Sequence, residues 1–192
     1  MIAKRIALAL VILAVALPLA AQQGQPRGKA EGTINGKKVV IDYGRPALKG
    51  RTLDALMKDL PEDRIWRAGE NQVTTLQTDT ALSIGGKQIP AGKYSLYVHA
   101  PAGGDWSLVV NKNLGVPLGD LWDEAPAEMK KAPWPALNGY GNIAKEEVAR
   151  IPMKKGTAAT AADVFNIAIK GETLTLAWGD MTWATTIKSG GT

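Results

Sequence analysis

The sequence contains no cysteine, one histidine and one phenylalanine among its 192 residues. The absence of cysteine excludes thiol nucleophiles, thiolate zinc sites, cysteine-ligated iron–sulfur clusters and lipid attachment through cysteine. A single histidine excludes a histidine-rich metal centre within one chain. A chain of this length buries enough apolar surface to fold without disulfides or a metal. Much of the usual chemistry of enzymes is therefore disfavoured, and we expect no metal and no cofactor.

Motifs of the common nucleotide and hydrolase sites are also absent. Gly44 and Gly50 are separated by five residues and followed by Arg51, whereas a P-loop needs four residues and then Gly-Lys-Ser/Thr. The sequence has no Gly-x-Gly-x-x-Gly after a strand, no Gly-x-Ser-x-Gly elbow and no Asp-x-Asp-x-Asp-Gly calcium loop. It also lacks a run of five or six basic residues, so we expect no nucleic-acid partner.

The first 21 residues have the order of a secretory signal peptide. Lys4 and Arg5 precede an apolar run over residues 6–17, and small residues follow up to Ala21. This run is shorter than the roughly 20 apolar residues of a membrane span, and no later stretch approaches that length. We predict cleavage near Ala21, a periplasmic or secreted location and no membrane span in the mature chain; an uncleaved anchor or a core helix is the alternative. Removal of the two leader cations lowers the net charge from +5 to +3.

The hydrophobic pattern of the mature chain is mostly that of strands. Apolar and polar residues alternate over Lys93–Ala100 and Trp106–Asn111, and again between Phe165 and Ile187. Turn signals that contain glycine separate these runs at even spacing. Eight or nine short strands with such turns predict an all-β fold, either an antiparallel β-sandwich or a partly closed barrel.

One short helix is expected over Thr52–Leu60, whose apolar residues recur at helical spacing between a threonine N-cap and a proline stop. The rest of the chain divides into a flexible N-terminal arm (22–37), a single β-sandwich domain (38–188) and a tail (189–192). Residues 114–139 interrupt the domain with four prolines, Trp122 and Trp134. Loops of this length are functional or disordered, and the two tryptophans favour an ordered segment.

The segment GRPALKGR (44–51) is the first candidate for ligand binding. It places three cations, Arg45, Lys49 and Arg51, beside two glycines. Arginine forks match the oxygens of carboxylates and phosphates, and glycine lets backbone amides approach an anion. We therefore predict ligand contacts from the three cations. The alternative is a loop whose arginines pair with carboxylates of the same chain.

The segment WRAGENQ (66–72) is the second candidate. It joins the expected helix to a strand, and loops on a rigid sheet are where binding residues concentrate. The alternative is a capping loop with Trp66 in the core, Gly69 at positive φ and Asn71 bonded to the backbone. An aromatic ring, a cation, an acid and two amides occur within these seven residues, and the predicted ligand contacts are Trp66, Arg67, Glu70, Asn71 and Gln72.

Five segments form a specific combination: GRPALKGR (44–51), IWRAGENQVT (65–74), IGGKQIPAGKYSLYV (84–98), a strand from Trp106 that ends in Asn-Lys, and EEVARIPMK (146–154). Together they resemble the exported bacterial family catalogued as domain of unknown function 2911. The resemblance runs from about Val39 to Ile187. It implies a β-rich exported domain and no established activity.

This sequence departs from the family pattern in two places. The family tends to read Gly-Ala-Asn-Glu where this chain has Gly-Glu-Asn-Gln at 69–72, so the acid has moved or been lost. The family runs quickly from the Asn-Lys strand to an Asp-x-x-Arg strand, whereas this chain inserts residues 114–139. Glu147 and Arg150 match that Asp and Arg, and such a pair serves structure as readily as function.

Three functions fit these features. The first is a non-catalytic module that binds a small anionic or polar ligand through the two loops. The second is an envelope protein-interaction domain, which requires an exposed apolar patch around Trp122 and Trp134. The third is a carboxylate- or metal-dependent hydrolase, which requires two acids, or His99 with acids, at one pocket. The shortage of histidine and cysteine places binding first and catalysis last.

Overall fold

The computed structural model describes residues 27–136 and 139–191. The predicted signal peptide (1–21) and the first part of the predicted arm (22–26) lie outside the described residues. Within the described ranges, no helix combines the length and the apolar character needed to cross a membrane.

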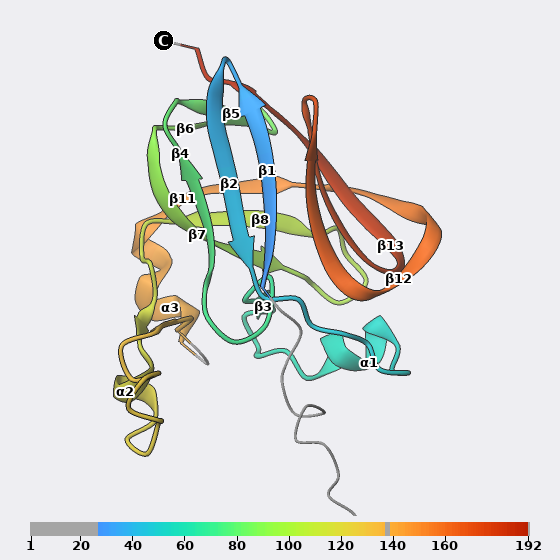
Figure 1. Cartoon of the computed structure of the whole chain (residues 1–192). Coiled ribbons are helices and arrows are strands. Elements are labelled where there is room, and N and C mark those ends of the chain that lie inside the picture. Colours follow the sequence, from blue (N-terminus) through green and yellow to red (C-terminus); the bar gives the residue numbers. More distant parts are fainter. Residues whose placement is uncertain (1–26, 137–138, 192) are drawn as a thin grey trace, which may run out of the picture.

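The described chain folds into two antiparallel sheets that enclose a common core (Figure 1). The larger sheet has the order β1 (Gly28–Ile34), β2 (Lys37–Tyr43), β4 (Thr74–Thr78), β7 (Gly92–His99), β8 (Ser107–Asn111) and β11 (Glu147–Pro152), with β3 (Ile65–Trp66) paired to β7. The smaller sheet has the order β12 (Lys154–Lys170), β13 (Thr173–Ser189), β5 (Leu82–Ile84) and β6 (Lys87–Ile89).

The predicted antiparallel sandwich is therefore confirmed, and the two sheets of the described chain do not close into a barrel. The described chain has thirteen strands, more than the eight or nine expected. Much of the excess comes from pairings of two or three residues, such as β3, that are too short to show a hydrophobic period of their own.

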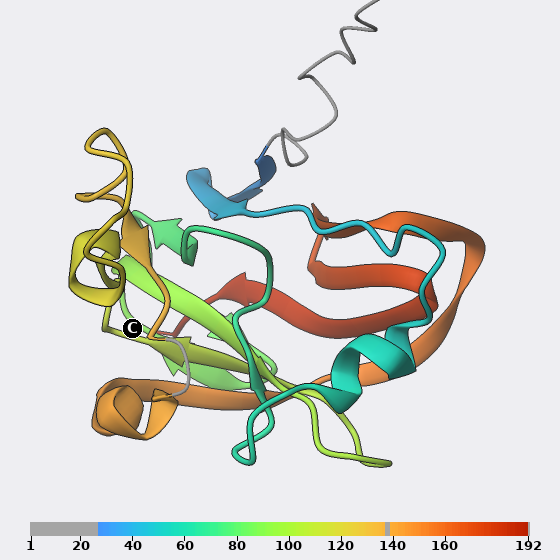
Figure 2. The same cartoon turned by 90° about the horizontal axis from the view of Figure 1, so that it is seen from below.

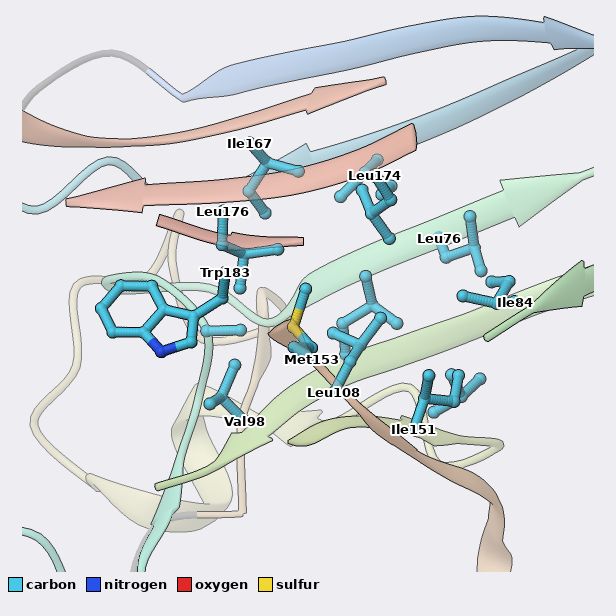
Figure 3. Close-up of a cluster of buried hydrophobic side chains, with 14 of the residues drawn as sticks. Leu76, Ile84, Val98, Leu108, Ile151, Met153, Ile167, Leu174, Leu176 and Trp183 are labelled. Carbon is cyan, nitrogen blue, oxygen red and sulfur yellow. The ribbon is translucent and has the colours of Figure 1, made fainter. Parts of the chain in front are cut away.

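The core between the sheets is built by the inward-facing side chains of the alternating strands. Leu76 and Leu108 of the larger sheet meet Ile167 and Leu176 of the smaller one (Figure 3), and all four are buried. Trp183 lies at one side of this cluster, where its ring stacks on that of Trp106 with 3.8 Å between centroids and 6° between planes.

The predicted helix is present as α1 (Leu53–Lys58), and the Thr52 hydroxyl caps it by accepting a hydrogen bond from the Ala55 amide at 3.2 Å. Figure 2 looks onto the end of the sandwich where α1 lies. Two further helices, α2 (Leu118–Leu121) and α3 (Tyr140–Ile143), are single turns, and a 3-10 turn over Ala144–Glu146 follows the second. Four residues are too few to show a helical period, so the sequence does not reveal them.

The prediction of a flexible arm over 22–37 is wrong for residues 28–34, which form β1 and pair along their whole length with β2. Asn35 and Gly36 make the connecting turn, with φ of 50° and 70°, as a two-residue type I′ hairpin requires. Two glycines interrupt the alternation of this strand and hide it in the sequence. One of them, Gly32, is needed because a Cβ there would lie 2.5 Å from Cγ2 of Ile169.

The segment rich in proline and tryptophan, called the covering segment below, reaches the outer face of the larger sheet through Ala136. It contains a ribbon of β9 (Val116–Pro117) and β10 (Pro133–Trp134), then leads into α3. Beneath it, Tyr97 and Val109 form a second buried cluster with Tyr140 and Ile143 of α3. The strand β7 is consequently buried on both faces, and this cover supplies one wall of the cavity described next.

Candidate functional site

A cavity of about 350 Å³ is lined by residues of β3, α1 and α3 and their neighbours. These three elements lie toward one end of the sandwich (Figure 1). The cavity volume falls in the range of small-molecule sites, roughly 300–1,000 Å³. One wall is apolar and is formed by the α1 region, by the core tryptophans and by the covering segment. Six polar side chains complete the lining: Arg51, Asp63, Arg67, Glu70, Tyr97 and Tyr140.

The two candidate loops meet at this cavity because their backbones pack directly against each other. A Cβ on Gly69 would lie 3.0 Å from the carbonyl oxygen of Gly44, so this approach depends on a residue without a side chain. Arg51 reaches the cavity from the first loop, and Arg67 and Glu70 reach it from the second. The fold thus brings part of each predicted site to one place.

Arg67 is the half-buried cation of the cavity. Burial lowers the pKa of its guanidinium, and the nearby Glu70 carboxylate acts in the opposite direction with a smaller effect. Within the described ranges, no carboxylate oxygen lies within 4 Å of this guanidinium. A desolvated charge is costly unless it is paired, so this arrangement favours an anion that enters from solvent.

Buried polar atoms without hydrogen-bond partners gather at the same place. Among the described residues they are Arg45 Nε, Glu70 Oε1 and the Tyr97 hydroxyl. Glu70 and Tyr97 line the cavity, and Arg45 belongs to the loop beside it. Burial raises the pKa of the Tyr97 phenol, and weak contacts of its hydroxyl with the Ala136 backbone and the Ser95 hydroxyl have a smaller, opposite effect. Because buried polar atoms are normally paired, the hydrogen bonding of Arg45 and Glu70 is incomplete within the described chain.

Backbone strain is concentrated in these loops. Left-handed φ angles occur at Lys49 (51°), Arg64 (55°), Ala68 (51°) and Asn71 (59°). Such conformations cost L-residues about 1–3 kcal/mol each and persist only where the surroundings impose them. The capping-loop alternative expected positive φ at Gly69, but positive φ occurs at Ala68 and Asn71 instead. These two residues determine the course of the backbone between Arg67 and Gln72.

Four of the eight predicted contact residues do not line the cavity. Lys49 is exposed, and its amide donates to the Asp163 carboxylate at 3.1 Å. Asn71 is exposed, and the Gln72 carbonyl accepts a hydrogen bond from Arg27 at 3.2 Å. Arg45 lies beside the cavity without lining it. The sequence could not distinguish these residues from their neighbours, because all eight belong to the same two loops.

Two other predicted residues line the cavity in a structural role. Trp66 is only 7% exposed and stacks on Trp178 with 5.2 Å between centroids, so it is a core residue whose edge reaches the cavity. The Arg51 guanidinium donates to the carbonyls of Leu48 at 2.9 Å and Ala47 at 3.2 Å. Its charge lies at the exposed rim, while its hydrogen bonds shape its own loop.

Tyr140 lines the cavity and was not predicted from the sequence. It is held in place by Glu147 and Arg150, the pair that matches the family pattern. The Tyr140 hydroxyl donates to the Glu147 carboxylate at 2.9 Å and accepts from the Asn111 amide at 3.2 Å. Arg150 grips the same carboxylate through two hydrogen bonds, at 3.0 and 2.9 Å. Burial is the main cause of the strongly raised pKa of Tyr140. The Glu147–Arg150 pair therefore supports a wall of the cavity.

Tyr97 was also missed as a cavity residue, although it lies on the polar face of an alternating strand. Nothing in the sequence shows that the segment after β8 returns to cover this face. His99 lies on the same strand, is half-buried and does not line the cavity; burial is the main cause of its lowered pKa.

The residues required by the hydrolase alternative are only partly brought together. Asp63 and Glu70 both line the cavity, but Asp63 also accepts a hydrogen bond from the Ile65 amide at 3.0 Å, which positions β3. In the part of the chain that the structure describes, no three His, Asp or Glu side chains gather in a way that could hold a metal ion.

Comparison with known proteins yields one match. A family model described as "Protein of unknown function (DUF2911)" matches residues 25–187, a range that includes both candidate loops and the Glu147–Arg150 pair. No curated protein and no solved structure matches the chain.

Proposed function

The chain belongs to the DUF2911 family of proteins of unknown function. We propose that it is a non-catalytic module that binds a small anionic or polar ligand in the cavity between its two loops. The observation that carries the proposal is the position of Arg67, a half-buried cation on the cavity wall with no carboxylate within 4 Å in the described chain.

The physical argument is one of pairing. A guanidinium offers a planar fork of donors that fits a carboxylate or a phosphate oxygen pair, and such charge-assisted bonds are strong where water is excluded. Arg51 adds a second cation at the rim. An anion that enters the cavity therefore supplies hydrogen-bond acceptors that Arg67 lost with its hydration water. The anion is attracted electrostatically by both Arg67 and Arg51.

Thermal unfolding of the purified protein against a panel of carboxylates and phosphates tests this proposal. A ligand that binds only the native state stabilises it by about 2.7 kcal/mol at a hundredfold excess over Kd. We expect a shift in Tm with at least one anion class, and its loss in Arg67→Gln. Lys49→Gln removes the same charge from an exposed residue that does not line the cavity, so it serves as the matched control. No shift with any anion, or equal loss in both variants, would overturn the proposal.

We further propose that the ligand is met outside the cytoplasm, because the first 21 residues have the order of a signal peptide. The mass of the protein recovered from the periplasm or the medium tests this. A chain that begins near Gln22 supports export, and a full-length chain confined to the cytoplasm contradicts it.

A second candidate function, contact with an envelope protein, is favoured by one observation. The exposed large apolar side chains of the described residues are Leu114, Leu121 and Trp122, with exposed fractions of 38%, 45% and 50%, and all lie in the segment 114–139. A photo-crosslinking residue at position 122 tests this, with exposed Lys188 as the control position. Adducts specific to position 122 support the interaction, and adducts at both positions or at neither contradict it.

A further inference from the structure

We propose that the cavity binds a small zwitterion of the α-amino-acid type with an apolar side group, its carboxylate on Arg67 and its ammonium on Glu70. This inference rests on the proposed function and names the ligand class of the same cavity. It starts from the charges that line the cavity, since a cation and an anion lie on one wall three residues apart.

The two charges are close but unpaired. They are close enough to interact, since the Glu70 carboxylate raises the pKa of the Arg67 guanidinium, although burial lowers this pKa by more. Yet no ion pair within 4 Å joins them in the described chain. The loop that carries both residues has a left-handed backbone at Ala68 and Asn71, and its Gly69 packs on Gly44.

The charges of the lining select between a simple anion and a zwitterion. A carboxylate alone pairs with Arg67, but it places a second negative charge beside the Glu70 carboxylate in the same lining. An ammonium on the carbon next to the ligand carboxylate removes this repulsion and pairs with Glu70. Tyr97 also lines the cavity and offers a further polar contact.

The remaining walls define the third part of the ligand. Leu56, Leu60 and Trp178 give the cavity an apolar side, and the residues that α1 itself contributes to the lining, Leu56 and Met57, are uncharged. A volume of about 350 Å³ is small among ligand sites, so it suits a molecule of amino-acid size. An aliphatic or aromatic side group would lie against this side.

Calorimetric titration of the purified full-length protein with matched ligands tests the inference. L-leucine is compared with 4-methylpentanoate, which lacks the ammonium, and with L-leucinamide, which lacks the carboxylate. L-phenylalanine and 3-phenylpropanoate form a second pair with a larger side group. We expect at least one of the two amino acids to bind tenfold or more tightly than its analogues.

Two variants separate the roles of the charges. Glu70→Gln is expected to weaken the amino acid tenfold or more and to leave the matched acid unchanged or bound more tightly. Arg67→Gln is expected to weaken both the amino acid and the matched acid. The Tm of each free variant is measured as well, and Lys49→Gln, which should leave every affinity unchanged, provides the control for charge removal.

The outcomes distinguish the inference from the proposed function. If a matched acid binds as tightly as its amino acid, in the wild type and in Glu70→Gln, the zwitterion is overturned while the anion-binding cavity stands. If neither amino acid binds, the zwitterion is likewise overturned, and the wider anion panel alone decides the proposed function.

Discussion

A Cβ atom on Gly44 would lie 1.9 Å from the carbonyl oxygen of Glu70 and 2.6 Å from its amide nitrogen. No side chain fits into such a space. The end of β2 and the loop that carries the charged cavity residues are therefore in backbone contact, and the position of Glu70 depends on the absence of a side chain at residue 44. The two candidate loops behave as one unit for this reason.

Replacement of Gly44 by alanine is expected to destabilise the protein and to displace the loop over 66–72. The added methyl group meets backbone, which cannot rotate away, and overpacking of this kind costs about 1–3 kcal/mol. Chemical denaturation measures the loss. Gly141→Ala is the matched control, because a Cβ there has no atom within 4 Å, and its effect should stay within about 0.5 kcal/mol. Equal stability of the two variants would show that the contact is not tight in solution.

Arg27 fastens the other end of the same loop. Its guanidinium donates to the Asp42 carboxylate and to the carbonyls of Gln72 and Val73, so it joins β2 to the start of β4. We expect Arg27→Ala to cost about 1 kcal/mol, a figure reduced because the pair is partly exposed, and to accelerate amide hydrogen exchange around residue 73. Lys29→Ala, at an exposed residue two positions further along the chain, should change neither quantity. Unchanged exchange in Arg27→Ala would contradict the fastening role.

The sequence predicts those parts of this molecule that depend on local periodicity. The alternating strands and the helix capped by Thr52 are visible in it, as is the antiparallel class of fold. The strand β1 is hidden because Gly28 and Gly32 carry no side chain to mark a face. The alternation of apolar and polar residues reflects which side of a strand or helix is buried. This signal is lost where the strand or helix is short or rich in glycine.

The candidate site was only partly predictable for a different reason. Arg67 and Glu70 stand out by residue type, but their convergence with Arg51 depends on close backbone contacts between distant segments. The contribution of Tyr97 depends on the cover that Ala136, Tyr140 and Ile143 form over it. Neither relationship leaves a period or a spacing in the sequence. The sequence therefore identified the loops and could not rank the residues within them.

Asn71 tests this ranking. It was a predicted ligand contact, but it is exposed, does not line the cavity and has φ of 59°. We expect Asn71→Gly to keep the ligand-induced shift in Tm and to leave stability equal or slightly higher, because glycine adopts this conformation without strain. Asn71→Val should lose about 1 kcal/mol or more, since a β-branched residue is strained there. Loss of the ligand-induced shift in a stable Asn71→Gly protein would instead make the side chain a ligand contact.

The carboxylate that supports Tyr140 makes stability depend on pH. Burial raises the pKa of Glu147, but hydrogen bonds from Arg150 and Tyr140 outweigh it, and the pKa falls below its ordinary value of 4.5. A carboxyl group whose pKa is lowered on folding contributes stability that is present above its unfolded pKa. This contribution is lost as the pH falls through the lower folded value. Glu147→Gln should therefore destabilise the protein by about 1 kcal/mol at pH 7, and the difference from wild type should shrink as the pH falls below 4.5.

Denaturation of both proteins across this pH window measures the effect, and Glu124→Gln provides the control. Glu124 is exposed in the covering segment, so its replacement should leave stability unchanged at every pH. A difference between wild type and Glu147→Gln that stays constant from pH 7 to pH 3 would contradict a role for the ionised carboxylate. No difference at any pH would instead show that the hydrogen-bonded shape of the side chain suffices to hold Tyr140, because glutamine keeps that shape at any pH.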